Sequence, residues 1–255
     1  MSSIAVRYVG GPTALVEIGG LRLLTDPTFD PPGDHPVGNR VLVKTAGPAL
    51  TPGDVGPVDA VLLSHDQHPD NLDDAGRDFL AAAPAAFSTG SAHERIGAAI
   101  RVLPNWETAE LARPDGGVLR ITGVPAQHGP DGTEHLTGEV TGFVLAGDGL
   151  PTVYVSGDNA SLDVVRAIAE RVGPVDVALL FAGAARTPVA DGPLTLTSER
   201  AAEAAEILGA AHVVPLHFEH WGHFTEGPDT LVAAFAAAGL SERLHLPKPG
   251  DRIEL

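Results

Sequence analysis

The stretch LLSHDQHPDNLDDAG, residues 62–76, places two histidines and several acidic residues in a loop that follows an apolar run. His65 and His68 are three residues apart at the end of that run, where strand ends converge and water is partly excluded. A tight turn and a helix start require only residues such as Asp70 and Asn71. The histidines exceed that requirement, and closely spaced imidazoles are metal ligands. The stretch therefore indicates either a metal site or a polar turn.

Three further apolar runs end in a potential ligand. His128 follows ITGVPAQ, Asp158 follows VYVSG, and His217 follows VVPL. Taken singly, each residue has an ordinary explanation. His128 could be a loop histidine, Asp158 a helix cap, and His217 a core histidine whose hydrogen bonds are satisfied. Active sites of layered folds collect at strand ends. Four such ends, each carrying His or Asp, together predict a ligand set for one or two divalent cations.

Composition limits both the metal and the partner. The chain has no cysteine, so a metal must be held by imidazole, carboxylate, carbonyl or water, which suits zinc first and manganese or iron as alternatives. A formal net charge of −17 opposes binding of nucleic acid or anionic membranes and favours a small-molecule substrate. No run has the length of a membrane span, and the start lacks a secretion signal. We expect a cytoplasmic protein.

The first third of the chain predicts strands and one helix around the histidine-rich loop. Short apolar runs with Gly-Gly punctuation predict a strand meander over residues 4–27. Residues 28–56 are rich in proline and glycine and read as a long loop, a class that is often functional. Residues 58–65 predict a buried strand. A helix is expected over residues 71–83, with Asp70 at its N-cap.

The remaining residues alternate strands and helices. Expected helices lie near residues 91–98, 161–172, 197–208 and 227–239. Expected strands lie within residues 85–90, 99–104, 117–128, 136–147, 152–158, 175–183 and 212–218. Two groups of strands separated by helices, with no linker between them, predict two sheets with outer helices in one domain over residues 1–255. The alanine-rich helices can pack on the sheets or pair two chains, so the oligomeric state stays open.

The order of the motifs resembles the metallo-β-lactamase fold superfamily of metal-dependent hydrolases. More narrowly, it is similar to the branch with L-ascorbate-6-phosphate lactonase and the N-acyl-phosphatidylethanolamine phospholipase D type. GGPTALVEIGGLRLLTDPTF, LLSHDQHPDNLD, VPAQHG, VYVSGD and VVPLHF occur in that branch's order. The resemblance implies an α/β (α+β) fold, a four-layer αββα sandwich of two mixed β-sheets flanked by helices. It also implies a metal site along one edge, where two divalent cations share a hydroxide.

The histidine-rich stretch departs from the family signature H-x-H-x-D-H in two ways. Counted from the strand end, His65 fills the first position with one extra residue after it; counted backward from Asp70, Asp66 fills that position. Both registers keep His68 and Asp70. Both also place Asn71 where the last histidine belongs, and an amide oxygen is a weaker ligand than an imidazole.

The resemblance implies two ligand sets. The first cation would take His65, His68 and His128. The second would take Asp70 and His217, with Asp158 bridging the two. Asp66 is the alternative ligand at the first site, and Asn71, His220 or His223 would complete the second.

These ligands imply hydrolysis by a metal-bound hydroxide of a small ester, lactone, amide or phosphodiester. Asp70 and His68 are the expected catalytic residues, with Asp70 orienting the hydroxide and exchanging its proton. Arg186 is a candidate for binding an anionic substrate group, or else a solvated loop arginine. Two alternatives remain: a metal-binding sensor or scaffold with a disabled second site, and a nuclease, which the negative charge disfavours.

Overall fold

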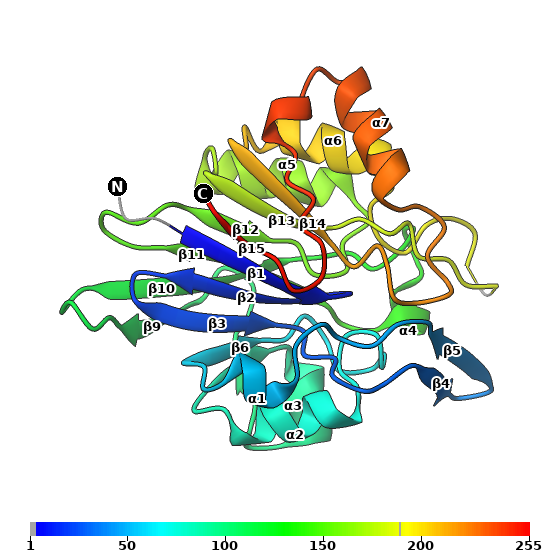
Figure 1. The fold of residues 1–255 in the computed structure, drawn as a ribbon, viewed down its shortest axis with the longest axis horizontal. Helices are drawn as coiled ribbons and strands as arrows, with labels where there is room; N and C mark the ends of the chain where they lie inside the picture. The colour runs from blue at the N-terminus through cyan, green and yellow to red at the C-terminus, as the bar shows by residue number, and fades with distance from the viewer. Residues whose placement is uncertain (1–3, 189) are drawn as a thin grey trace.

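The computed structural model describes residues 4–188 and 190–255, and two sheets packed face to face form its centre (Figure 1). The first sheet contains, in spatial order, β15 (Arg252–Glu254), β1 (Ile4–Gly10), β2 (Thr13–Ile18), β3 (Leu21–Thr25), β6 (Ala60–Leu62), β7 (Ala86–Ser88) and β8 (Arg101–Val102). The second contains β14 (His212–Leu216), β13 (Val177–Phe181), β12 (Val153–Val155), β11 (Thr141–Ala146), β10 (Val118–Pro125) and β9 (Thr108–Ala112). Both sheets are mixed, because each combines antiparallel and parallel pairs.

Helices cover the two outer faces of this sandwich (Figure 1). The first sheet carries α1 (Pro52–Val55), α2 (Asp74–Ala82) and α3 (Gly90–Ile96). The second carries α5 (Leu162–Val172), α6 (Ser198–Ile207) and α7 (Pro228–Ala237). A short α4 (Glu134–Thr137), a 3-10 turn η1 (Ser241–Arg243) and a separate hairpin of β4 (Gly33–Val37) and β5 (Arg40–Lys44) complete the fold. The expected four-layer αββα sandwich is confirmed.

Apolar burial explains why these layers hold together. Side chains of both sheets, including Tyr8, Phe143 and Phe181, form one continuous core between the sheets. A second apolar cluster lies between the second sheet and its helices, and a third lies between the first sheet and its helices. Removing this surface from water is the main favourable contribution to folding. Within the described ranges, no helix is long and apolar enough to cross a membrane.

The strand directions bring four loops to the same edge. β12, β13 and β14 are parallel neighbours. β10 is antiparallel to β11, which is antiparallel to β12, so β10 runs in the same direction as β12. The loops after β10, β12 and β14 therefore leave one edge of the second sheet, and the loop after β6 meets them from the first sheet. The residues predicted as ligands lie on these four loops.

The structure differs from the sequence expectations in residues 28–56 and at two sheet edges. The expected long loop contains the β4–β5 hairpin and α1, which the apolar pattern hides because Val41 and Val43 are exposed rather than buried. The edge strands β9 and β15 were not expected, since they are short and polar (TAELA and RIE).

The N-cap of α2 is Asp73, and the expectation that Asp70 caps this helix is wrong. The Asp73 carboxylate accepts hydrogen bonds from the backbone N–H groups of Gly76 (2.8 Å) and Phe29 (2.9 Å). It also pairs with the Lys44 ammonium at 2.8 Å, and both side chains are almost fully buried. One carboxylate thus joins the hairpin, the segment after β3 and the start of α2.

We predict that Asp73→Ala lowers the free energy of unfolding by about 3–5 kcal/mol, because it leaves the buried Lys44 ammonium without its counter-charge and removes the helix cap. Urea unfolding measures the effect. Asp78→Ala, at an exposed position of the same helix, is the control and should stay within about 0.5 kcal/mol of wild type. An equally small loss for Asp73→Ala would show that the ion pair contributes little.

Candidate metal centre

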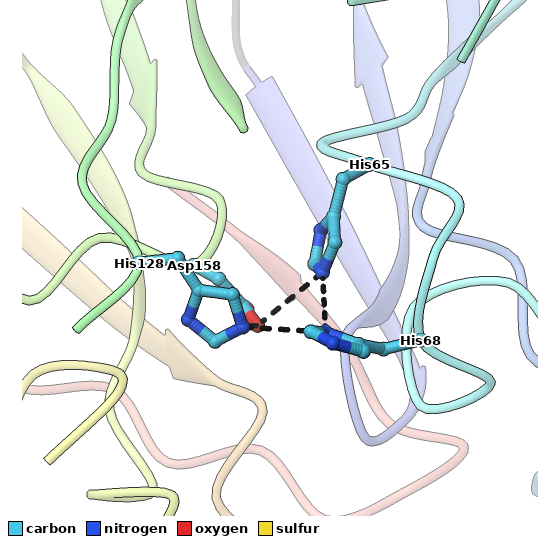
Figure 2. Close-up of side chains that lie close together, drawn as sticks. All are labelled: His65, His68, His128 and Asp158. Atoms are coloured by element: carbon cyan, nitrogen blue, oxygen red, sulfur yellow. Dashed lines mark hydrogen bonds and ion pairs between the residues drawn. The ribbon is translucent and has the colours of Figure 1, made fainter. Parts of the chain in front are cut away.

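Three imidazoles and one carboxylate converge at the edge where the four loops meet. The ligand atoms of His65, His68, His128 and Asp158 all lie within 4.8 Å of one another (Figure 2). His68 Nδ1 lies 2.9 Å from His65 Nε2 and 3.3 Å from His128 Nε2. His128 Nε2 is also 3.3 Å from Asp158 Oδ2. The side chains come from the loops after β6, β10 and β12 and point toward one another.

This donor set fits a single divalent cation. Tetrahedral zinc with ligand bonds near 2.1 Å separates its ligand atoms by about 3.4 Å. The two separations from His128 Nε2, of 3.3 Å, are close to that value, while His65 Nε2 lies 2.9 Å from His68 Nδ1 and 4.0 Å from Asp158 Oδ2. Burial lowers the pKa of His68 to about 4 and lowers that of His65 well below its usual value. Both imidazoles are therefore neutral near pH 7, the form that binds a metal.

A second set of contacts orients these imidazoles. His128 Nδ1 donates a hydrogen bond to the Leu194 carbonyl at 2.8 Å, so Nε2 keeps its lone pair for the centre. His65 Nδ1 lies 3.0 Å from the Ser64 hydroxyl oxygen, which leaves Nε2 facing His68. The Ser64 backbone N–H donates to Asp26 at 2.6 Å. The first two contacts determine that His128 and His65 each present Nε2 to the centre.

A second group lies beside the first and shares Asp158. His217 Nε2 is 3.4 Å from Asp158 Oδ1 and 3.3 Å from Asp70 Oδ2. His223 Nε2 is 3.0 Å from the same Asp70 oxygen. His217 Nε2 and Asp70 Oδ1 are buried without a hydrogen-bond partner, although buried polar atoms are normally satisfied. A cation between them would satisfy the nitrogen and balance the carboxylates.

The electrostatics of this second group favour positive charge. Burial alone would raise the pKa of Asp70, yet His223 and His217 hold it well below its usual value. Burial would lower the pKa of His217, but Asp158 and Asp70 outweigh burial and raise it to about 10. The two carboxylates are thus ionised and need a positive partner, which a proton on His217 or a metal ion can supply.

The alternative ligands lie in other environments. Both Asp66 oxygens contact the Arg95 guanidinium, with Nε at 2.9 Å from Oδ2, so the geometry favours the register that begins at His65. The His220 imidazole packs on the backbone of Gly10. Asn71 turns its NH2 group toward Asp158, at 3.2 Å.

A cavity of about 350 Å³ opens onto both groups. His68, Asp70, His128 and His223 form its base. One wall comes from the β4–β5 hairpin and the other from α4 and the loop after β13, with apolar residues Val37, Val41, Leu42, Leu136, Ala185 and Leu194. Arg40 and Arg186 also line it. The cavity therefore offers an apolar surface and cationic groups beside the ligands. Val189 lies outside the described residues.

Sequence comparisons connect this geometry with known proteins. A family model described as a beta-lactamase superfamily domain matches residues 21–218. The chain is 27% identical to a UPF0173 metal-dependent hydrolase of Pyrococcus furiosus, over 99% of this chain and 100% of the relative. It is 28% identical to another UPF0173 metal-dependent hydrolase, from Rubrobacter xylanophilus, over 97% of this chain and 95% of the relative.

Solved structures share the fold. An isothiocyanate hydrolase from Delia radicum gut bacteria superposes with a TM-score of 0.81 at 21% identity, over 98% of both chains. A possible metal-dependent hydrolase from Veillonella parvula superposes with a TM-score of 0.82 at 18% identity, over 99% of both chains. At these identities the likeness extends to the arrangement of the sheets and helices.

We predict that His65→Ala lowers the metal content and that Asp66→Asn leaves it unchanged. His65→Ala should lose at least half of the bound cation, because it removes an imidazole that faces the centre. Asp66→Asn should retain the wild-type content, since that side chain pairs with Arg95. Elemental mass spectrometry of protein purified without chelator measures both. Loss of metal in Asp66→Asn, with His65→Ala unchanged, would reverse the register.

Proposed function

The chain belongs to the beta-lactamase superfamily and is a metal-dependent hydrolase, and we propose that it uses two divalent cations, zinc first, to hydrolyse a small ester, lactone or phosphodiester. The observation that supports this most is the shared carboxylate Asp158, which contacts His128 through one oxygen and His217 through the other. A carboxylate placed between two imidazole groups suits a pair of cations.

In this proposal the first cation is held by His65, His68, His128 and Asp158, and the second by Asp70, His217 and Asp158. When bound, such cations acidify water and polarise the acceptor oxygen of a substrate. Zinc is favoured by the imidazole-rich, sulfur-free donor set, and manganese or iron suits the same oxygen and nitrogen ligands. The shared core between the two sheets supports treating residues 1–255 as one hydrolase domain.

Asp70 is the proposed proton carrier. Its Oδ1 is buried without a hydrogen-bond partner, while Oδ2 faces His217 and His223. Asp70 also lies at the base of the cavity, within reach of a bound substrate. The unpartnered oxygen can accept a proton from the attacking water and return it to the leaving group. His68, the least buried of the three clustered histidines, borders the same cavity and orients the reacting groups.

The cavity supports a small, partly apolar substrate. Its apolar walls suit an acyl, alkyl or ring portion, and the exposed Arg186 beside them suits a carboxylate or phosphate. A volume of about 350 Å³ is at the lower end of the range for small-molecule sites. The small volume of the cavity and the net charge of −17 both oppose a nucleic-acid substrate.

We predict that Asp70→Ala and His128→Ala each reduce kcat/KM by about 10²–10⁴-fold, because one removes the proton carrier and the other a ligand. Initial rates on 4-nitrophenyl esters, lactones and bis(4-nitrophenyl) phosphate with added Zn²⁺ or Mn²⁺ measure this. His212→Ala, at the other end of β14, is the control. Rates near wild type for either site variant, with native circular dichroism, would contradict the assigned roles.

We predict that Arg186→Gln raises KM about tenfold for substrates with a carboxylate or phosphate, because a charged hydrogen-bonding partner is lost. KM for neutral esters of the same size should not change. Arg120→Gln, on β10 in an exposed ion pair with Asp148, is the matched control. An equal change in KM for neutral and anionic substrates would show that Arg186 does not bind the charged group of the substrate.

A further inference from the structure

We propose that His223 is a ligand of the second cation and supplies the imidazole that is lost from the signature at Asn71. This inference rests on the proposed function, since it requires that the edge bind metal. It goes further by assigning the ligand to a loop six residues beyond His217, outside all five motifs. The second site is thereby completed by a residue of the loop after β14.

Asn71 is poorly placed to act as the missing ligand. Its side-chain nitrogen donates to Asp158 Oδ1 at 3.2 Å and lies 3.4 Å from the Ser64 hydroxyl oxygen. An amide NH2 group has no lone pair available for a metal, and the amide oxygen is the atom turned away from Asp158, where it is buried without a hydrogen-bond partner. Turning the amide over would place its oxygen against the Asp158 carboxylate, and two acceptors would then face each other. Asn71 therefore orients the shared carboxylate.

His223 has the position of a ligand. Its Nε2 lies 3.0 Å from Asp70 Oδ2, which is also 3.3 Å from His217 Nε2. His217 Nε2 is in turn 3.4 Å from Asp158 Oδ1. These separations are close to the roughly 3.4 Å between neighbouring ligands of a tetrahedral cation. We therefore assign His217, His223, Asp70 and Asp158 to the second cation, without Asn71.

The loop after β14 brings His223 back to the site through an unusual backbone. His217 and His220 have φ values of 56° and 74°, a left-handed region that non-glycine residues rarely adopt. Such strain persists only where surrounding structure supports it, and it collects at functional sites. The reversed loop is held at Gly222, whose N–H donates to the Val43 carbonyl at 2.9 Å, and at His223, whose carbonyl accepts from Arg186.

The surroundings of the His223 ring also suit a ligand. The ring packs on Phe224 with 4.6 Å between centroids, and this contact supports the orientation of the ring. The side chain is 15% exposed and lines the cavity together with Asp70. Nε2 therefore faces Asp70 from the cavity side, opposite the fully buried His217.

The test is the number and affinity of zinc ions bound by the full chain. Wild type, His223→Ala and His223→Gln are titrated with Zn²⁺ against a chromophoric chelator, and metal per chain is measured by elemental mass spectrometry. His220→Ala is the matched control, because it removes an imidazole from the same loop that packs on Gly10. We expect two equivalents for wild type and His220→Ala. Both His223 variants should keep the first equivalent and bind the second at least about 100-fold more weakly.

The first equivalent serves as an internal check on folding, since it uses none of the His223 contacts. Two tightly bound equivalents in both His223 variants would overturn the inference and leave the proposed function intact. Loss of both equivalents in His223→Ala and His223→Gln, at an unchanged melting temperature, would also overturn it, because His223 would then act on the whole centre. Binding of a single zinc equivalent by wild type would mean that there is no second site and would overturn the inference. Binding of no zinc by wild type would overturn the proposed function itself.

Discussion

The constraint on which the site depends is a pair of buried carboxylates that face imidazoles rather than lysine or arginine side chains. Asp70 and Asp158 lie at the junction of the two sheets, almost fully removed from water, and both keep pKa values below the usual range. Ionised groups in such a place are costly unless they are paired or coordinate metals. The side chains around them are imidazoles, and either a proton on His217, whose pKa is raised to about 10, or a metal ion can supply the balancing charge. A divalent cation would balance this charge, which agrees with the match to metal-dependent hydrolases of the beta-lactamase superfamily.

The rest of the fold holds these groups in place. Parallel strand directions carry the loops after β10, β12 and β14 to one edge, and the loop after β6 meets them there. Hydrogen bonds behind the ligands support their orientation. His128 Nδ1 donates to the Leu194 carbonyl, and the Ser64 backbone N–H donates to the Asp26 carboxylate. The buried pair of Lys44 and Asp73 ties the β4–β5 hairpin to α2, so that one wall of the cavity is fixed relative to its base.

The sequence predicts two sheets with outer helices and the approach of the strand-end ligands, because both follow from local patterns, while the αββα sandwich comes from the family resemblance. Apolar runs that end in His128, Asp158 and His217 identify loops at a sheet edge without knowledge of side-chain positions. The place of His223 is harder to foresee, since it depends on left-handed backbone at two non-glycine residues. The hairpin within residues 28–56 was missed because its valines are exposed. The pairing of Asp66 with Arg95 joins residues 29 positions apart, and no local pattern shows it.

The central claim is that divalent cations balance the buried carboxylates at this edge of the sheets. Its most direct test is anomalous X-ray diffraction from crystals grown with zinc, recorded at wavelengths on both sides of the zinc absorption edge. We predict two anomalous peaks per chain, one among His65, His68, His128 and Asp158 and the other between Asp70 and His217. Zinc at surface sites only, with both of these positions lacking anomalous signal at full zinc saturation, would contradict the metal-centred interpretation of the whole site.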